Sequence, residues 1–575
     1  MAVRDGTSWP LARKDALSGD KGETSLLEGF ESKETRVVGT TNLYQNGQLR
    51  LIPIPTPDPK DPLNLPTWRK WFAVGTLCFF GSLGLSAEVI IGSLLPVFLL
   101  EYSGVDPHVL NDVDFVAKSG GSSSQLNPMS VVPPGVEPFP LGQVSLLATI
   151  PTFGNGIASY LLVPLSIGVG RRPVLLFSAV CAWAGGLGAG FSTTFEQHLA
   201  ARAVQGLGVG AVEALIPLIV QDLVFIHQRN KAMSLIVSSQ GIVIIALGIA
   251  APYVAANYTW RWLYYISSGF GILAWLLLIV GLPETRWNRS KEELSGARVY
   301  PIPEGSLRPD LDPQTYGRRT LWTEFGVFQF GFDWKGAGKS MLQTLWSTVF
   351  PTVVWCVLAN SVFVIVNQAT QQTLAFALLA QGWEFQFTGL SVIPAFSASL
   401  LVFVLGGPVA DKLSNAITRW NGGSREPEHH LVNLIMPFVS GVAGCFVFGF
   451  AGDNSLHWGI LLLGATLVIF GFLTVMSIFN VFIVESYPMW AGPVLVNVSS
   501  LRLIIAFFLA SQATTWVAER GLLAVFAIYA EVMLVLSLGI PFLYFFGKRL
   551  RQWTGRIVHG AKKEKKGAID SPVSV

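Results

Sequence analysis

The stretch GLSAEVIIGSLLP, from Gly84 to Pro96, lies inside an apolar run that extends from Trp71 to Leu100, and it carries one carboxylate, Glu88. A run of about 20 apolar residues is long enough for a helix to cross the hydrocarbon core of a bilayer. A charge near the bilayer centre costs roughly 3 kcal/mol, and such residues usually face a protein interior and serve transport. The stretch therefore predicts a membrane-spanning helix with a functional acid.

The composition of the whole chain is typical of a polytopic membrane protein. Of its 575 residues, 51% are hydrophobic and only 13% are charged, whereas soluble domains usually contain about 25% charged residues. The net charge of +3 is too small to argue for a nucleic-acid partner. The four cysteines lie in separate apolar segments and follow no metal-ligand spacing, so we expect neither a metal nor another cofactor.

Apolar runs of this length occur twelve times and predict an all-α membrane protein with two sets of six transmembrane helices. The first set comprises Trp71–Leu100, Leu141–Ile167, Val174–Phe191, Leu199–Val220, Ala232–Val254 and Trp262–Leu282. The second set comprises Leu345–Val366, Phe387–Val409, Leu431–Ala451, Trp458–Val484, Val494–Val517 and Leu522–Phe546. A polar stretch between the sets separates two bundles.

These spans divide the chain into five parts. They are a disordered tail at 1–65, a first bundle at 66–285 with a long outer loop at 101–140, a central loop at 286–343, a second bundle at 344–547 and a basic tail at 548–575. Lys and Arg gather in the loops on one side, which the positive-inside rule makes cytoplasmic. We therefore expect both chain ends in the cytoplasm. On the other side, the tripeptide NYT at Asn257 fits a glycosylation site.

Motifs of soluble enzymes do not explain the polar residues. The segment DWKGAGKS ends at Ser340 and looks like a phosphate-binding loop, but such a loop needs Gly where Asp333 stands. The Asp333 carboxylate would repel phosphate. The sequence contains no HExxH or GxSxG motif and no cluster of His and Cys. We therefore predict that the protein is not an enzyme.

Two loops look like weak copies of one another, and each follows the second helix of its half. The first reads LLVPLSIGVGRRPVLL from Leu161, and the second reads VLGGPVADKLS from Val404. Such position-matched pairs are typical of transporters built from parallel repeats. On these loops the chain resembles the major facilitator superfamily, and most of all its fungal drug:proton antiporter branch.

Further motifs carry the resemblance, which covers about 58–553. The pattern R-x-x-Q-G opens the fourth helix at Arg202, LPETRW closes the first half from Leu282, and VESYPMWAG is followed by Arg502. The resemblance implies the major facilitator fold, proton coupling and a small organic substrate. It also implies a multi-pass protein of the plasma membrane, which we expect to be a monomer.

Charged residues within the spans are candidates for coupling. Arg202 and Glu213 lie eleven residues apart on the fourth helix, so at about 100° per residue they share nearly one face. Glu531 lies in the twelfth span and Arg502 in the eleventh. The resemblance implies that the first and fourth helices line the cavity. We therefore expect Glu88 and Glu213 to face water, one as proton carrier and one as cation partner.

The chemistry of coupling follows from one carboxylate serving two cations. A carboxylate that receives a cationic group releases its proton more readily, so arrival of substrate and departure of the proton are linked. The alternative is a neutral, hydrogen-bonded Glu that only ties helices together. Four amides near the seventh helix either contact substrate or belong to a loop. They are Asn367, Gln368, Gln371 and Gln372.

A second group of residues is expected at the inner ends of the helices, in gating contacts. These residues are Gly170, Arg171, Arg172, Asp222, Glu284, Asp411 and Lys412. Gly170, Arg171 and Arg172 match the end of the family loop signature, and the second copy of the loop keeps Asp411 and Lys412.

The leading hypothesis is a proton-coupled transporter that exports a drug or secondary metabolite. Import of polyamine-like cations is the alternative, favoured by Glu88, by Glu213 and by the fifth-helix signature. That signature reads ALGIAAPYVAA and keeps Gly248 and Pro252, with alanines in place of its final glycines. The stretch DPLNLPTWRKW from Asp61 also resembles the entry to the first helix in polyamine and histidinol permeases, which import cations. A membrane sensor that binds without transporting is a third hypothesis.

Overall fold

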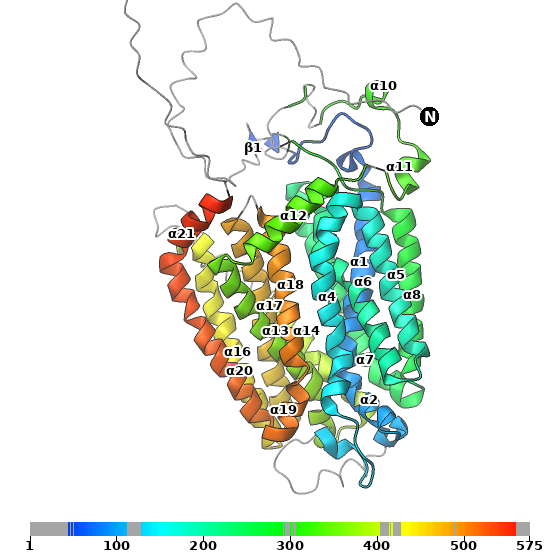
Figure 1. Ribbon diagram of the computed structural model, residues 1–575, viewed down its shortest axis with the longest axis vertical. Helices are drawn as coiled ribbons and strands as arrows, with labels where there is room; N and C mark the ends of the chain where they lie inside the picture. The colour runs from blue at the N-terminus through cyan, green and yellow to red at the C-terminus, as the bar shows by residue number, and fades with distance from the viewer. Residues whose placement is uncertain are drawn as a thin grey trace, which may run out of the picture. The chain divides into compact units, whose positions relative to one another are not determined.

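The computed structural model describes residues 44–45, 48–49, 51–111, 128–290, 293, 299–301, 303, 306, 308–329, 331–402, 413, 416–417, 427–487 and 490–558. These residues belong to one compact unit that starts at Leu43. Its long helices lie side by side, as Figure 1 shows. Strand structure in the described residues is limited to one antiparallel pair, β1 (Tyr44–Gln45) and β2 (Gln48–Leu49). The predicted all-α fold is confirmed.

The first half contains the helices expected from its six apolar runs. They are α1 (Thr67–Val89) with η3 (Ile90–Leu94) and α2 (Leu95–Tyr102), then α4 (Leu141–Val169), α5 (Arg171–Phe191), α6 (Phe195–Leu223), α7 (Ile226–Asn257) and α8 (Arg261–Gly281). Three short 3₁₀ turns accompany them, η2 (Pro62–Asn64), η4 (Pro107–Asn111) and η5 (Pro128–Val131).

Three short helices connect the halves, and the second half follows. The connecting helices are α10 (Pro313–Tyr316), α11 (Leu321–Phe325) and α12 (Trp334–Ser347). The second half comprises α13 (Pro351–Ala380), η6 (Phe385–Val392), α14 (Ile393–Leu401), η8 (Pro427–Leu434), α16 (Ile435–Asp453), α17 (Trp458–Ser486), α18 (Ala491–Ala510), α19 (Ala513–Arg520), α20 (Leu522–Ser537) and α21 (Gly539–Val558).

The eighth of the twelve predicted spans is described only in part. Within the described residues, eleven helical stretches are long and apolar enough to cross a membrane. The predicted eighth span, Phe387–Val409, appears as a shorter apolar helix from Phe385 to Leu401, and residues 403–410 lie outside the described part.

The helix of the first predicted span is interrupted one residue after Glu88. The α-helix α1 ends at Val89, the 3₁₀ turn η3 follows, and α2 begins with Pro96 in its first turn. Proline lacks a backbone N–H and its ring clashes with the carbonyl four residues earlier, so it starts a helix more readily than it continues one. The apolar run therefore forms two helices, with the acid at their junction.

Each half has its own apolar core, and the halves meet along two seams. The first core includes Leu77, Leu215 and Leu278, and the second includes Phe448 and Phe526. Between the halves, α4 packs on α18 and α7 packs on η6. The α4–α18 seam is tight, because a Cβ at position 156, which is Gly, would lie 2.9 Å from the Ser500 carbonyl oxygen.

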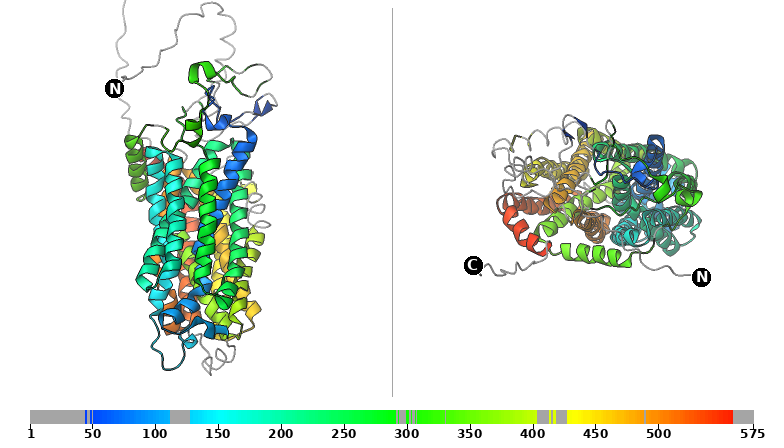
Figure 2. Two further views of the ribbon diagram at one scale, coloured as in Figure 1. Left: turned by 90° about the vertical axis from the view of Figure 1, so that its right-hand side faces the viewer. Right: turned by 90° about the horizontal axis from the view of Figure 1, so that it is seen from above.

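We name the two ends of the helical body by the elements that lie there. The α12 end holds the start of α1, the end of α4 and the helix α12, and the α19 end is opposite. In the view along the long axis, α12 lies at the margin of the body (Figure 2), where it contacts both α4 and α18.

Residues 51–65, at the end of the predicted tail, pack at the α12 end. Asp61 is fully buried and forms an ion pair with Arg289, whose nitrogen lies 2.6 Å from its carboxylate. The Asp61 carboxylate also accepts hydrogen bonds from the backbone N–H and the hydroxyl of Thr56. Arg319 donates to the carbonyls of residues 59–61. This part of the tail is therefore packed rather than disordered, and the other domain limits remain a prediction.

Candidate functional site

A cavity of about 140 Å³ lies between the two halves. It is lined by Leu85, Glu88, Gly92, Ala148, Glu213, Val364, Asn367, Gln368, Gln371, Gln372, Phe472, Arg502 and Leu503. Three of the five predicted coupling residues thus share one cavity, namely Glu88, Glu213 and Arg502. The four predicted amides join them, and all four lie within the helix α13 rather than in a loop.

Glu88 is held by neutral donors from α4. Its Oε1 accepts a hydrogen bond of 2.6 Å from the Thr152 hydroxyl, and its Oε2 accepts one of 3.2 Å from the Asn155 amide. The Thr152 oxygen in turn accepts a 2.7 Å hydrogen bond from the Gln368 amide of the second half. The carboxylate is therefore linked to the opposite half through one hydroxyl.

Glu213 is held by a cation from the opposite half. Arg502 of α18 donates from Nη2 to Glu213 Oε2 over 2.6 Å. The Arg502 side chain is 3% exposed and the Glu213 side chain 22% exposed. This ion pair is a second direct link between the halves. The two carboxylates of the cavity thus differ in their partners, because Glu88 accepts hydrogen bonds from neutral donors and Glu213 is paired with a guanidinium.

The amides of α13 leave hydrogen-bonding atoms without a partner in the described part of the chain. These atoms are Asn367 Oδ1, Gln368 Oε1, Gln372 Oε1 and Gln372 Nε2. A buried polar atom without a partner is costly. The cavity therefore favours a solute that brings its own hydrogen-bonding groups.

Arg202 lies behind the cavity wall and not in it. It is fully buried and donates to the carbonyls of Ala87, over 2.8 Å, and Leu147, over 3.1 Å. A third bond of 2.5 Å joins it to the side-chain oxygen of Gln205. Arg202 therefore contacts the backbone next to Glu88 and is not among the residues that line the cavity, where the prediction put it.

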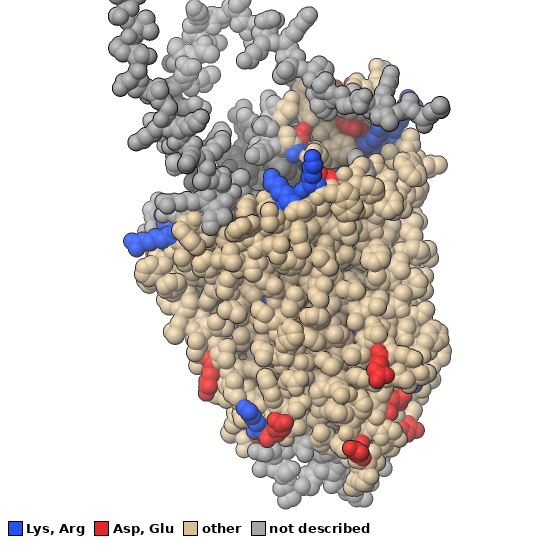
Figure 3. All heavy atoms as spheres, viewed as in Figure 1, with Lys and Arg blue, Asp and Glu red and all other residues tan. Residues whose placement is uncertain are grey.

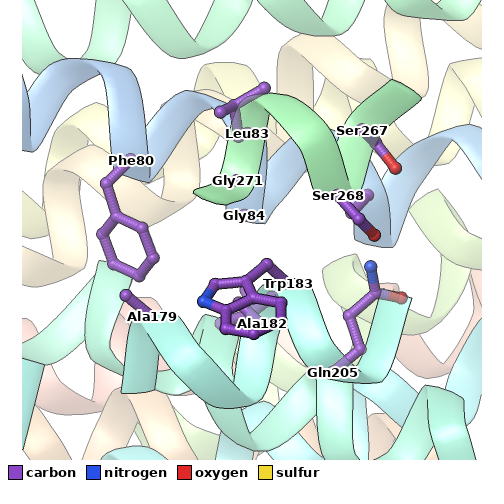
Figure 4. Close-up of a pocket in the computed structure, with 12 residues that line it drawn as sticks. Phe80, Leu83, Gly84, Ala179, Ala182, Trp183, Gln205, Ser267, Ser268 and Gly271 are labelled. Atoms are coloured by element: carbon purple, nitrogen blue, oxygen red, sulfur yellow. The ribbon is translucent and has the colours of Figure 1, made fainter. Parts of the chain in front are cut away.

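A second cavity, of about 30 Å³, lies within the first half between α1, α5, α6 and α8 (Figure 4). The amide of Gln205 reaches toward Ser268, and the Trp183 indole lies beside them. The Ser268 hydroxyl and the Trp183 N–H have no hydrogen-bond partner in the described structure. A water needs roughly 10–15 Å³ of such space, so this cavity suits water and not an organic solute.

Glu531 points away from the central cavity, against the prediction. The buried face of α20 contains Phe526, Tyr529, Ala530 and Met533. Glu531 is exposed on the opposite face, beside the exposed Val532 and Val535. The sequence gives the depth of a residue along the helix but not its angular position when both faces are apolar, and the prediction failed there.

Glu284 caps the helix α5 from a distant part of the chain. Its carboxylate accepts hydrogen bonds from the backbone N–H groups of Arg171, over 3.0 Å, and Arg172, over 3.2 Å. A carboxylate is favoured at a helix N-terminus, where N–H groups lack partners. The preceding Gly170 has φ of 127°, and a Cβ there would lie 2.6 Å from a Glu284 oxygen. Only glycine suits this position.

The remaining predicted gating residues in the first half brace its α12 end. Arg171 forms an ion pair with Asp222. Arg172 is buried and donates to the carbonyls of Ile279, Glu324 and Gly326, so it ties the central loop to the bundle. Within the described residues, the ion pair and hydrogen bonds of Arg171 and Arg172 connect only to the first half and the central loop. Asp411 and Lys412 lie outside the described residues.

Asn257 is exposed at the last residue of α7, at the α19 end. Its amide donates to the Tyr253 carbonyl over 2.9 Å. Glycosylation there remains a prediction.

Several residues that build the site have no signal in the sequence. Thr152 and Asn155 lie in an apolar run where a hydroxyl or amide is unremarkable, and only the fold brings them to Glu88. The ion pair of Asp61 and Arg289 joins segments 228 residues apart.

Comparison with known proteins agrees with this architecture. Residues 72–495 match the model of the Major Facilitator Superfamily. An efflux pump of Penicillium aethiopicum, vrtL, is 23% identical over 69% of this chain and 76% of its own. Protein HOL1 of Saccharomyces cerevisiae is 21% identical over 90% of this chain and 96% of its own.

A solved structure shows the same fold. The xylose transporter XylE from E. coli, in a partially occluded inward-open conformation, superposes with a TM-score of 0.55. The two chains are 14% identical, and the match covers 84% of this chain and 98% of that one. The predicted fold of two six-helix halves is thereby confirmed.

Proposed function

The chain belongs to the major facilitator superfamily, and on that premise we propose that this membrane transporter is a proton-coupled antiporter that exports a small organic molecule. The single observation that carries the proposal is the cavity between the halves, which both Glu88 and Glu213 line. Relatives named as efflux pumps favour export over import.

Glu88 is the proposed site of coupling. Its oxygens face a hydroxyl and an amide, and no cation lies within ion-pair distance of it in the described structure. A carboxylate without a fixed counter-ion can bind a proton or a cationic solute, but each disfavours the other. Binding of one thus promotes release of the other.

Glu213 and Arg502 are the proposed latch between the halves. A proton on Glu213, or a solute cation beside it, weakens its ion pair with Arg502. The hydrogen bond from Gln368 to Thr152 makes a second link next to Glu88. Loss of both links frees the halves to rock about the central site, as alternating access requires.

Import of polyamine-like cations is a second candidate, favoured by the charge of the cavity. When ionised, its two carboxylates face one guanidinium and leave an excess of one negative charge. Three amides add acceptor oxygens without partners in the described structure, those of Asn367, Gln368 and Gln372. A solute with several N–H donors fits this lining.

We also propose that the α12 end faces the cytoplasm of a plasma-membrane protein. Arg171, Arg172, Arg286 and Arg289 all lie at that end, as the positive-inside rule requires. The opposite end carries Glu101 and Asp106 next to α2. A monomer is sufficient for this mechanism, because both halves come from one chain.

Transport in proteoliposomes tests the proposal. Purified protein would be given labelled spermidine or a labelled amphipathic cation, with the lumen made either acidic or alkaline. An antiporter accumulates the probe in vesicles with an acidic lumen, and a symporter in vesicles with an alkaline lumen, whichever way the protein inserts. Saturable binding without flux under either gradient would favour the sensor and overturn transport of these probes.

A further inference from the structure

The helix α12 has one buried side and one exposed side. Asp333 caps it, since its Oδ1 accepts a 2.8 Å hydrogen bond from the Gly336 N–H. Small residues form the buried face, which contains Ala337, Ser340, Thr344 and Ser347. The segment that looks like a phosphate-binding loop is thus the start of an ordinary capped helix.

Both halves hold the buried face of α12. On the first half, the Asp333 backbone N–H donates to the Gly168 carbonyl of α4 over 2.9 Å. On the second half, the Asn497 amide of α18 lies 3.2 Å from the Thr344 carbonyl oxygen and 2.9 Å from the Thr348 hydroxyl. The helix therefore bridges the seam between the halves.

The exposed side of α12 is largely apolar. Trp334, Leu342, Leu345 and Trp346 are each more than half exposed. The exposed apolar surface continues past the helix through Val349 to Val354 on the membrane-spanning α13. Leaving such surface in water costs about 25 cal/mol per Å², and its continuity with a membrane span indicates that lipid covers it.

The exposed side of α12 also carries two cations. Lys335 and Lys339 are exposed and four residues apart, so they are neighbours on the helix surface. At about 100° per residue they lie on the same side as Leu342 and Trp346, nearer the start of the helix. Figure 3 shows basic side chains over α12, acidic ones predominating at the opposite end, and most of the surface between them without charge. Lysines and tryptophans beside an apolar stripe are typical of helices that lie in the membrane interface.

We propose that α12 lies in the membrane interface and that Lys335 and Lys339 bind the headgroup of an anionic phospholipid. The lipid acyl chains cover Leu342 and Leu345, and its phosphate lies between the two ammonium groups. Since α12 is bonded to both halves, a bound lipid favours the arrangement in which α4 and α18 both contact it.

Lipid titration of the full-length protein in detergent tests the proposal without any transport assay. Fluorescent phosphatidylserine and phosphatidylcholine would be the probes. Each lysine near an anionic headgroup contributes about fivefold in affinity. The Lys335→Gln/Lys339→Gln variant should therefore bind phosphatidylserine at least fivefold more weakly, while its affinity for phosphatidylcholine is unchanged.

A matched variant and two conditions complete the test. Lys60→Gln/Arg318→Gln removes two charges at the same end but outside α12, and should bind both lipids as the wild type does. The wild-type preference for phosphatidylserine should shrink in 1 M salt, where the Debye length is about 3 Å. Soluble glycerophosphoserine should not compete. Equal affinity of the wild type for both lipids, retention by the glutamine variant, or competition by the soluble headgroup would overturn the proposal.

Discussion

Glu88 and Glu531 are both carboxylates within membrane spans, but their surroundings differ. Glu88 accepts hydrogen bonds from Thr152 and Asn155 at the wall of the central cavity. Glu531 is exposed among apolar side chains on the outer face of α20. The same substitution at the two positions therefore distinguishes a coupling role from a general effect of charge removal.

We expect Glu88→Gln to lower gradient-driven flux in proteoliposomes at least tenfold, because an amide can neither carry the proton nor hold a cation. Glu531→Gln serves as the matched control and should stay within twofold of the wild type. Initial rates of probe uptake under a pH gradient give the measurement. Equal rates for Glu88→Gln and the wild type would remove Glu88 from the coupling path.

The ion pair of Glu213 and Arg502 gives a second prediction. Glu213→Ala leaves a buried guanidinium without its partner, which costs about 3 kcal/mol, so the Tm in detergent should fall. In the double variant with Arg502→Met, no charge is left unpaired, and the Tm should recover in part. A double variant less stable than either single variant would show that the two side chains act independently.

At the scale of the element, the junction of α4 and α5 depends on one backbone conformation. Gly170 has φ of 127°, and Glu284 fills the space where a side chain would lie. We expect Gly170→Ala to lower the Tm by several degrees, through both backbone strain and the displaced cap. Gly75→Ala in α1 is the control, since a Cβ there meets nothing within 4 Å, and its Tm should be unchanged or higher.

The central loop is held to α1 by a carboxylate that titrates. The Arg69 guanidinium donates to the Glu324 carboxylate over 2.6 Å and holds the pKa of Glu324 below its usual value of 4.5. A carboxyl whose pKa is lower in the folded state stabilises that state above its unfolded pKa, and the contribution is lost as the pH falls through the folded value. Thermal melting between pH 6 and pH 3 should therefore show a loss of stability below about pH 4.5 that is smaller in Glu324→Gln. Identical pH profiles for the two proteins would contradict this.

At the scale of the whole molecule, the sequence predicts the architecture better than the site. Apolar runs and loop motifs suffice for two six-helix halves, and the family pattern places Glu213 and Arg502 in the right helices. The outward direction of Glu531 and the backbone contacts of Arg202 depend on packing. The bond between Thr152 and Gln368 joins residues 216 positions apart, and no local pattern contains it.

Separation of the halves can be tested at the α19 end. A Cβ at position 142 on α4, which is Gly, would lie 3.3 Å from the Thr515 hydroxyl of α19. In the Gly142→Cys/Thr515→Cys variant, oxidation should therefore form a disulfide and stop flux, and a reductant should restore it. Each single variant controls for oxidation of the native cysteines. Undiminished flux in the crosslinked protein would mean that the halves do not part here.

The interruption of the first span places a 3₁₀ turn next to Glu88, the carboxylate that we propose as the site of coupling. A continuous helix carries a tilt along its full length, whereas two helices joined by a 3₁₀ turn can pivot separately. The helix α1 packs on α6, α7 and α8, while α2 packs on α4 and α13. In the proposed mechanism, α2 can move with the α19 end while α1 keeps its main contacts, and Glu88 lies one residue before the turn between them. In that mechanism, a proton that binds Glu88 therefore changes the charge directly beside the turn that separates the two helices.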